Sequence, residues 1–256
     1  MSTKNEEQVP QQDVVQKSVQ KEHVNVFDTY DFDGLALSME ALLKAGVHFG
    51  HQKARRNPKM NEYVYATRNN INIIDLSKTV ERLDEALRFL TSVKKSGKQI
   101  LFVGTKKQAR QLVVDAAAFT DNPFVVERWL GGTFTNFGNI RRRVRYMVRL
   151  QEQIAKGDMK KYTKFEQMKK REEAQKLDRR MGGIAQMREL PGAIFITDVE
   201  ADKLAIREAQ KMNIPVVALV DTNVNPEAVT YPIPANDDAV SSLKLILAYV
   251  CKTLQK

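Results

Sequence analysis

Two carboxylates and two histidines are the residues whose types and spacing could hold a metal ion. Asp198 and Asp221 each follow an apolar, strand-like run, where α/β enzymes place their chemistry. His48 and His51 are three residues apart, but no cysteine or third histidine follows at a zinc-like spacing. Asp is also a common turn residue after strands. A metal site at His51, Asp198 and Asp221 is therefore an alternative to ordinary turn and hydrogen-bonding roles.

Phosphate binding is suggested where the apolar run 99–103 gives way to Gly-Thr-Lys-Lys. A strand followed by glycine and a helix presents free backbone N–H groups, and Lys106 and Lys107 add positive charge. The Gly-x4-Gly-Lys-Ser/Thr spacing of a P-loop and a Gly-x-Gly-x-x-Gly fingerprint are both missing. The junction therefore favours polynucleotide phosphates over a mononucleotide, with an ordinary helix start and solvated lysines as the alternative.

The segment 47–60 has the composition of a basic loop. Lys53, Arg55, Arg56 and Lys59 surround the turn formers Asn-Pro. This pattern is more typical of a nucleic-acid surface than of a protein core.

A basic helical arm is predicted after residue 138. The stretch 126–149 passes the only tryptophan, Trp129, turns through two glycines and enters an arginine-rich helix. Trp129 could stack on a base or pack beneath the arm. A Gly-Asp pair at 157–158 breaks the helical pattern, and Lys and Arg greatly outnumber Asp and Glu on both sides of it. We expect a two-helix hairpin with a narrow apolar seam, in which Ile140, Val144, Met147 and Ile154 face Phe165, Met168, Leu177 and Met181.

The rest of the chain alternates strand-like and helical segments, which predicts a parallel α/β sheet. Ser77 and Asp237 are expected to cap two of the helices. Residues 1–36 are polar without sustained periodicity and are expected to be disordered. The net charge of +10 favours a polyanionic partner. A single cysteine, no signal-peptide pattern and no long apolar run favour a cytoplasmic protein with no membrane association.

Several motifs, taken in order, resemble the family of bacterial small-subunit ribosomal protein S-two. They include Gly-Val-His-Phe-Gly-His-Gln at 46–52, Phe-Val-Gly-Thr-Lys at 102–106, Arg-Trp-Leu-Gly-Gly at 128–132 and Val-Asp-Thr-Asn-Val-Asn-Pro at 220–226. Shorter matches lie at 57–60, 68–69, 73–76, 135–137, 182–184, 214–216, 231–234 and 236–239. One departure is Arg56, which stands where the family usually has an aromatic residue.

The resemblance implies a flavodoxin-like, doubly wound parallel sheet with helices on both faces and an inserted basic coiled-coil hairpin. It implies a structural protein of the small subunit that binds ribosomal RNA and neighbouring ribosomal proteins, and helps to anchor the large mRNA-binding first protein. The family is not one of enzymes, so no cofactor or small-molecule substrate is expected. The rivals are a phosphate-binding enzyme that uses the strand-end aspartates with a metal, and a free RNA-binding regulator.

The sequence thus predicts an α/β domain over 37–138 and 190–256, interrupted by the hairpin over 139–189. The expected RNA-binding residues are Lys53, Arg55, Arg56, Lys59, Arg68, Lys106, Lys107, Arg110, Arg128, Trp129, Arg141, Arg142, Arg143 and Arg145.

Overall fold

A five-stranded parallel sheet forms the centre of the protein, in a computed structural model that describes residues 24–157, 159 and 162–255. Its strands run in the order β5-β4-β6-β7-β8. The strands are β4 (Ile100–Val103), β5 (Phe124–Val125), β6 (Ala193–Ile196), β7 (Val216–Val220) and β8 (Tyr231–Pro234). The second strand of this series lies outside the first, which is the flavodoxin-like order. The expected doubly wound α/β fold is therefore confirmed.

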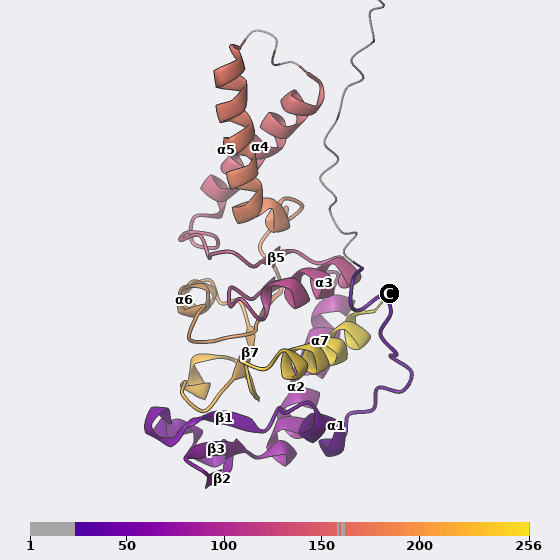
Figure 1. Cartoon of the computed structure of the whole chain (residues 1–256), viewed down its shortest axis with the longest axis vertical. Coiled ribbons are helices and arrows are strands. Elements are labelled where there is room, and N and C mark those ends of the chain that lie inside the picture. The colour runs from indigo at the N-terminus through magenta and orange to yellow at the C-terminus, as the bar shows by residue number, and fades with distance from the viewer. Residues whose placement is uncertain (1–23, 158, 160–161, 256) are drawn as a thin grey trace, which may run out of the picture.

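The strands are buried on both faces because helices cover each side of the sheet (Figure 1). Phe102 and Phe195 face a core shared with α2, α3 and α7, while the alternate residues Leu101 and Ile194 face α6 and the base of the hairpin. This alternation follows from the two-residue repeat of a strand. The covering helices are α2 (Leu76–Lys95), α3 (Arg110–Thr120), α6 (Lys203–Lys211) and α7 (Val240–Leu254).

Strand β8 closes one edge of the sheet although it contains Pro232 and Pro234. Proline lacks a backbone N–H, and at an edge it can point its nitrogen away from the ladder. The sequence pattern gave no strand at this position.

A second, three-stranded antiparallel sheet packs beside α1 (Met39–Lys44) in the N-terminal part of the domain (Figure 1). It consists of β1 (Phe49–Gln52), β2 (Val64–Arg68) and β3 (Ile71–Ile74). The segment 47–60, expected to be a loop, therefore contains a strand and two short 3-10 helices, Lys53–Arg55 and Pro58–Tyr63. Asn69 and Asn70 have positive φ and form the turn between β2 and β3. Asparagine tolerates that conformation better than most residues.

The expectation that residues 1–36 are disordered is wrong for residues 24–36, whereas residues 1–23 lie outside the described part. Phe27 is fully buried, and Phe32 stacks on Phe119 of α3 with ring centroids 5.3 Å apart. The hydroxyl of Tyr249 donates to the carbonyl of Ala36 at 2.9 Å. This segment, called here the N-terminal strap (24–36), covers apolar surface on α3 and α7.

Two helix caps differ from those expected. Asp75, not Ser77, caps α2, since its carboxylate accepts from the Ser77 N–H at 3.0 Å. The last helix begins after Ala239, and Asp237 instead contacts Lys106.

The hairpin consists of α4 (Phe137–Ala155) and α5 (Lys164–Met181), which project from the domain side by side (Figure 1). Thr163 and Glu166 form a capping box that starts α5. The apolar seam differs in part from the one expected: Val144, Met147, Leu177 and Met181 are buried, together with Leu150, Met159 and Ala174. Phe165 and Met168 are instead 59% and 49% exposed. In the described residues, no helix is both long enough and apolar enough to span a bilayer.

Candidate nucleic-acid interface

Glu208 of α6 organises the loop from which the hairpin starts. Its buried carboxylate accepts the backbone N–H groups of Gly132, Phe134 and Thr135 at 2.7, 3.0 and 3.2 Å, and the Trp129 indole N–H at 3.2 Å. Burial alone would raise the pKa of Glu208, but these donors outweigh it and hold the pKa below its usual value. The carboxylate therefore stays ionised and ties α6 to the base of the hairpin.

Trp129 belongs to this base and is only 5% exposed. Its ring meets Phe134 edge to face, with centroids 5.0 Å apart. The indole packs inside the protein at the base of the hairpin, which fits the second of the two roles considered for Trp129 and leaves no exposed ring face to stack on an RNA base. Arg128, the preceding residue, is exposed.

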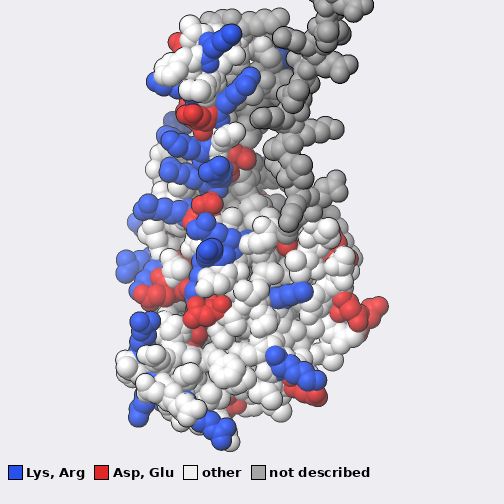
Figure 2. Space-filling model, in the orientation of Figure 1, with Lys and Arg blue, Asp and Glu red and all other residues white. Residues whose placement is uncertain are grey.

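The arginines at the start of α4 point into solvent. Arg141, Arg142, Arg143 and Arg145 are all exposed, while Val144 between them faces the seam. Within the described residues, none of the four forms an ion pair with a carboxylate. Figure 2 shows Lys and Arg side chains following one edge of the molecule from the hairpin down across the domain.

The cations of the 53–59 segment differ in their exposure to solvent and in their ion pairs. Lys53 and Arg55 are exposed, whereas Arg56 is half-buried and its Nε is shielded without a partner in the described structure. Lys59 pairs with Glu227 on the surface. Arg68, at the end of β2, is exposed.

Lys106 does not point outward, as RNA binding would require. Its ammonium lies 2.8 Å from Asp237, 2.6 Å from Asp238 and 3.2 Å from Asp198. Burial alone would lower the pKa of Lys106, but the hydrogen bonds that its ammonium donates to Asp237 and Asp238 raise the pKa. The lysine is therefore held as the counter-ion of a carboxylate cluster, while the neighbouring Lys107 is exposed.

This cluster occupies the point where the strand order of the sheet reverses. Gly104 directly follows β4 and Asp198 lies two residues after β6; these two strands flank the reversal. Ligands of flavodoxin-like proteins bind at this point, outside the carboxyl ends of the strands. A Cβ at Gly104 would stand 2.7 Å from Val113 and 2.8 Å from Thr197, so the glycine allows close packing here. Arg110 turns inward, donating from Nε to the Thr105 carbonyl at 2.9 Å. Side chains of this protein thus form hydrogen bonds and ion pairs at the position that a ligand takes in related folds.

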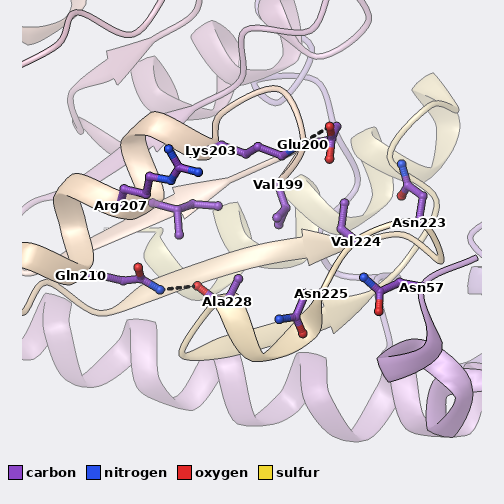
Figure 3. Close-up of a pocket in the computed structure, with 11 residues that line it drawn as sticks. Asn57, Val199, Glu200, Lys203, Arg207, Gln210, Asn223, Val224, Asn225 and Ala228 are labelled. Carbon is purple, nitrogen blue, oxygen red and sulfur yellow. Dashed lines mark hydrogen bonds and ion pairs between the residues drawn. The ribbon is translucent and has the colours of Figure 1, made fainter.

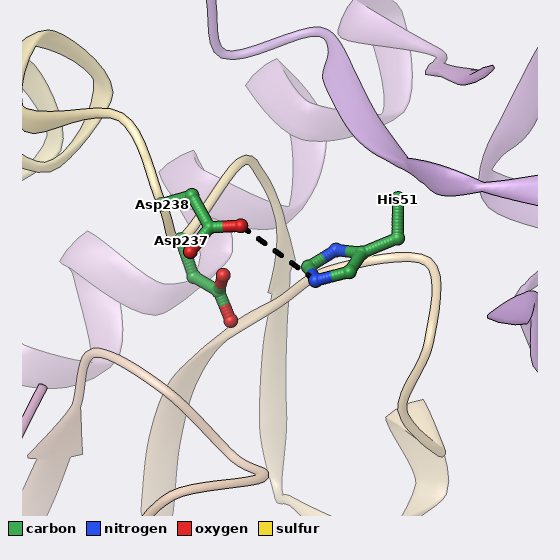
Figure 4. Close-up of side chains that lie close together, drawn as sticks. All are labelled: His51, Asp237 and Asp238. Carbon is green, nitrogen blue, oxygen red and sulfur yellow. Dashed lines mark ion pairs between the residues drawn. The ribbon is translucent and has the colours of Figure 1, made fainter.

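Of the three residues considered as an alternative metal site, His51 and Asp221 lie together, whereas Asp198 pairs with Lys106. The Nδ1 atom of His51 lies 3.0 Å from Asp221, and its Nε2 lies 3.6 Å from Asp238 (Figure 4). One ligand atom each from His51, Asp237 and Asp238 lies within 4.8 Å of the others. Lys106 already supplies one positive charge to both Asp237 and Asp238, so the protein itself provides a counter-ion at this position.

The charges of the cluster perturb its titration. Burial, reinforced by repulsion from Asp198 and Asp221, raises the pKa of Asp237 to about 7. Burial likewise raises the pKa of Asp202 to about 6. The hydrogen bond with Asp221 raises the pKa of His51. Asp237 and Asp202 therefore release their protons closer to neutral pH than ordinary aspartates do.

The roles of Glu208 and Asp237 were not evident from the sequence. Glu208 lies within an amphipathic helix, where a glutamate is normally a solvated residue. The available sequence signal was its position three residues after Ala205 and one before Ala209, which places Glu208 beside the buried face of the helix; both alanines are fully buried. Asp237 looked like a helix cap, and only the three-dimensional structure brings it to Lys106.

The fold and the geometry define a basic α/β scaffold protein with a projecting hairpin. The ion pairs of Lys106 lie at the sheet position where related folds bind a ligand. Residues 42–256 match the family described as ribosomal protein S2. The chain belongs to this family, whose members are ribosomal proteins and not enzymes.

Curated relatives support the same assignment. The small ribosomal subunit protein uS2 of Roseiflexus castenholzii is 50% identical over 214 residues, which cover 84% of this chain and 81% of that protein. The protein of the same name from Dehalococcoides mccartyi is 47% identical over 209 residues, covering 82% of this chain and 85% of the relative. The resemblance expected from the motifs is therefore confirmed.

Proposed function

We propose that this protein is a structural component of the small ribosomal subunit, in the cytoplasm, and that it binds ribosomal RNA mainly through phosphate contacts. The observation that carries this proposal is the row of exposed arginines on α4, which have no carboxylate partners among the described residues. The net charge of +10 and the names of the relatives support the same role.

The structure narrows the set of candidate contact residues. Trp129 and Lys106 are removed, because one is buried and the other is bound by three aspartates. Lys59 and Arg110 have exposed or half-exposed carboxylate partners, and such surface pairs are worth so little that phosphates can replace them. The remaining candidates are Lys53, Arg55, Arg56, Lys59, Arg68, Lys107, Arg110, Arg128, Arg141, Arg142, Arg143 and Arg145.

The mode of recognition follows from the kinds of side chain on this surface. Lysine and arginine contacts to phosphates provide affinity that falls steeply with salt. Folded RNA is recognised largely through its shape and backbone, and paired bases are hidden from side chains in the deep major groove. The projecting hairpin allows the protein to contact RNA well beyond its compact domain (Figure 1).

Contacts with neighbouring ribosomal proteins form the second part of the proposal. Membership of the ribosomal protein S2 family supports a role in anchoring the large mRNA-binding first protein of the small subunit. Crosslinking of assembled subunits would test this: the expected product joins this chain to that protein, and subunits lacking this chain should retain less of it.

Replacement of Arg141, Arg142 and Arg143 by alanine tests the RNA contacts. The three side chains are exposed, so the isolated fold should remain intact while binding to small subunits weakens. Each lost phosphate contact lowers the slope of log K against log salt concentration by roughly 0.7–0.9. The triple variant should therefore lose about two to three units of slope. Sedimentation of labelled protein with small subunits over a salt series gives both quantities.

A charge-matched control uses three cations in the second half of α2 and just after it, on the opposite side of the sheet from α6. Replacing Arg88, Lys95 and Lys98 by alanine removes the same charge but should leave the slope nearly unchanged. Equal losses of salt slope in the two triple variants would mean that only the net charge of the protein matters. Unchanged binding of the α4 variant would reject the hairpin as an RNA contact. Wild-type protein that stays at the top of the gradient would indicate a free RNA-binding regulator instead.

A further inference from the structure

A pocket of about 350 Å³ lies between α6 and the loop that follows β7 (Figure 3). Side chains from α6, from residues 223–228 and from Asn57 surround it. Its volume falls within the roughly 300–1,000 Å³ typical of small-ligand sites. It is distinct from the Lys106 cluster, since none of the charged residues of that cluster lines it.

The walls of the pocket combine apolar surface with carboxamides. Val199, Ile206 and Val224 supply the apolar part, and each is only 4% exposed. Three asparagines, Asn57, Asn223 and Asn225, supply amide groups that can both donate and accept hydrogen bonds. Apolar walls with a few convergent polar groups are typical of sites that orient a flat heterocyclic ligand.

The three asparagines have unused hydrogen-bonding capacity. The Oδ1 atoms of Asn57 and Asn225 accept the backbone N–H groups of Lys59 and Glu227, which fixes those side chains and leaves their NH₂ groups to the pocket. The Oδ1 atom of Asn223 is shielded from solvent and has no partner in the described structure. A buried acceptor without a donor costs free energy, so a ligand gains when the Asn223 amide turns and its Oδ1 accepts a hydrogen bond from that ligand.

Positively charged side chains also line this pocket. Arg207 is exposed on α6 and lines the pocket, and Lys203 lies one turn earlier. Glu200 is the only carboxylate of the lining, and Lys203 neutralises it. The planar guanidinium of Arg207 can stack on a base or bind a phosphate. The pocket therefore suits a ligand with a polar, aromatic edge and a negative charge.

The pocket is also placed between two basic elements of the proposed RNA surface. Asn57 lies in the 53–59 segment, between Arg56 and Lys59. On the other side, Leu204 of α6 lies 3.9 Å from the position of a Cβ at Gly131, in the turn before the hairpin. An RNA strand that contacts both the 53–59 segment and the base of the hairpin would pass the mouth of this pocket.

We propose that the pocket receives a single unpaired nucleotide of the RNA, with its base against the apolar wall and hydrogen-bonded by the asparagines. This inference rests on the proposed RNA-binding function and adds a site of base-specific contact to it. Unpaired bases are the parts of folded RNA that side chains read by stacking and by hydrogen bonds to their edges. Arg207 holds the phosphate or the face of that nucleotide.

Nucleotide-resolution probing of small subunits rebuilt with variants of the full chain tests the proposal. Arg207→Ala and Asn223→Ala alter the pocket, while Lys211→Ala removes an exposed charge from the same helix outside it. Dimethyl sulfate and a 2′-hydroxyl acylating reagent report on base edges and on nucleotide mobility. With wild-type protein, one unpaired nucleotide should be protected. Both pocket variants should restore its reactivity, and Lys211→Ala should preserve the protection.

Affinity should change in the same pattern. Loss of a stacked base contact weakens binding by roughly tenfold, so Arg207→Ala and Asn223→Ala should dissociate faster than Lys211→Ala. If all variants join the subunit and no unpaired nucleotide responds to the pocket variants, the pocket proposal is wrong while RNA binding stands. A pocket that crosslinks to a neighbouring protein would likewise overturn it. Failure of the wild-type chain to join subunits would reject the underlying function instead.

Discussion

Replacement of Glu208 by glutamine should loosen the base of the hairpin. Two donors, the Trp129 indole and the Gly132 N–H, point at Oε1, whereas the Phe134 and Thr135 N–H groups point at Oε2. Whichever way the glutamine amide turns, its NH₂ group faces two N–H donors that it cannot accept from. Each buried donor left without a partner costs about 1–3 kcal/mol. With two such donors, the variant should therefore lose about 2–6 kcal/mol of unfolding free energy.

Urea unfolding monitored by fluorescence measures this loss directly, because Trp129 is the only tryptophan and lies at the site. The folded variant should also show a red-shifted emission where its NH₂ group takes the Oε1 position, because the indole then loses its acceptor and gains contact with water. Glu200→Gln is the matched control, since that carboxylate is exposed and paired only with Lys203. If the two variants unfold at the same urea concentration, the carboxylate of Glu208 does not hold the loop.

The pH dependence of the same variant gives a second check. The pKa of Glu208 lies below its usual value, so its contribution to stability is present above the pKa of the unfolded chain. That contribution should disappear as the pH falls through the lowered pKa of the folded state. The stability of Glu208→Gln should accordingly change less than that of the wild type on the acid side, and parallel acid limbs would contradict the assignment.

Two further predictions concern the strap and the carboxylate cluster. Phe27→Ala should reduce the unfolding free energy by about 3–5 kcal/mol because the ring is fully buried, whereas Val24→Ala, at a site 65% exposed, should have little effect in the same urea titration. Asp237 has a pKa raised to about 7 in the folded state. Between about pH 4 and pH 7 the folded state therefore keeps a proton on Asp237 that the unfolded chain has already released. Ionisation of Asp237 lowers the stability as the pH rises through this range. Asp237→Asn should flatten that decline in urea midpoints measured across this range, and an unchanged slope would exclude Asp237 as its source.

Periodicity predicted the central sheet and its helices because the apolar pattern of each strand and helix can be recognised within its own segment of the sequence. Apolar runs such as 193–197 can be buried only as strands between helix layers, and the observed β6 differs by one residue. The edge strand β8 was missed because it contains Pro232 and Pro234, and prolines normally argue against a strand. The N-terminal strap was missed because Phe27 and Phe32 are isolated aromatics among polar residues, and only α3 and α7 give them a surface.

The seam of the hairpin shows a different limit of sequence patterns. The helical repeat predicted two apolar stripes, but it does not fix how far one helix is displaced along the other. Phe165 and Met168 fall in the first turns of α5, where they are largely exposed, and Ala174 and Leu150 take their place. Small residues such as Ala174 carry little weight in hydropathy, although they allow two helices to approach closely.

Lys106 illustrates how one residue can serve either RNA binding or the fold, and a substitution separates the two. Three aspartates surround its ammonium group, so Lys106→Met would leave buried carboxylates without a counter-charge. Removing one partner of a buried ion pair typically costs about 3–5 kcal/mol. Lys107→Met, at the exposed neighbouring position, removes the same charge from the surface and should cost little stability.

The two variants should therefore have opposite phenotypes. Lys106→Met should unfold at lower urea concentrations at neutral pH and recover part of its stability near about pH 5, where Asp237 and Asp202 are protonated. Lys107→Met should unfold normally and bind RNA with a smaller salt slope, by about one phosphate contact. If Lys106→Met instead remains fully stable and loses RNA affinity, the ammonium must leave the aspartates in the complex, and the point of strand reversal would then be an RNA contact and not an internal ion-pair cluster.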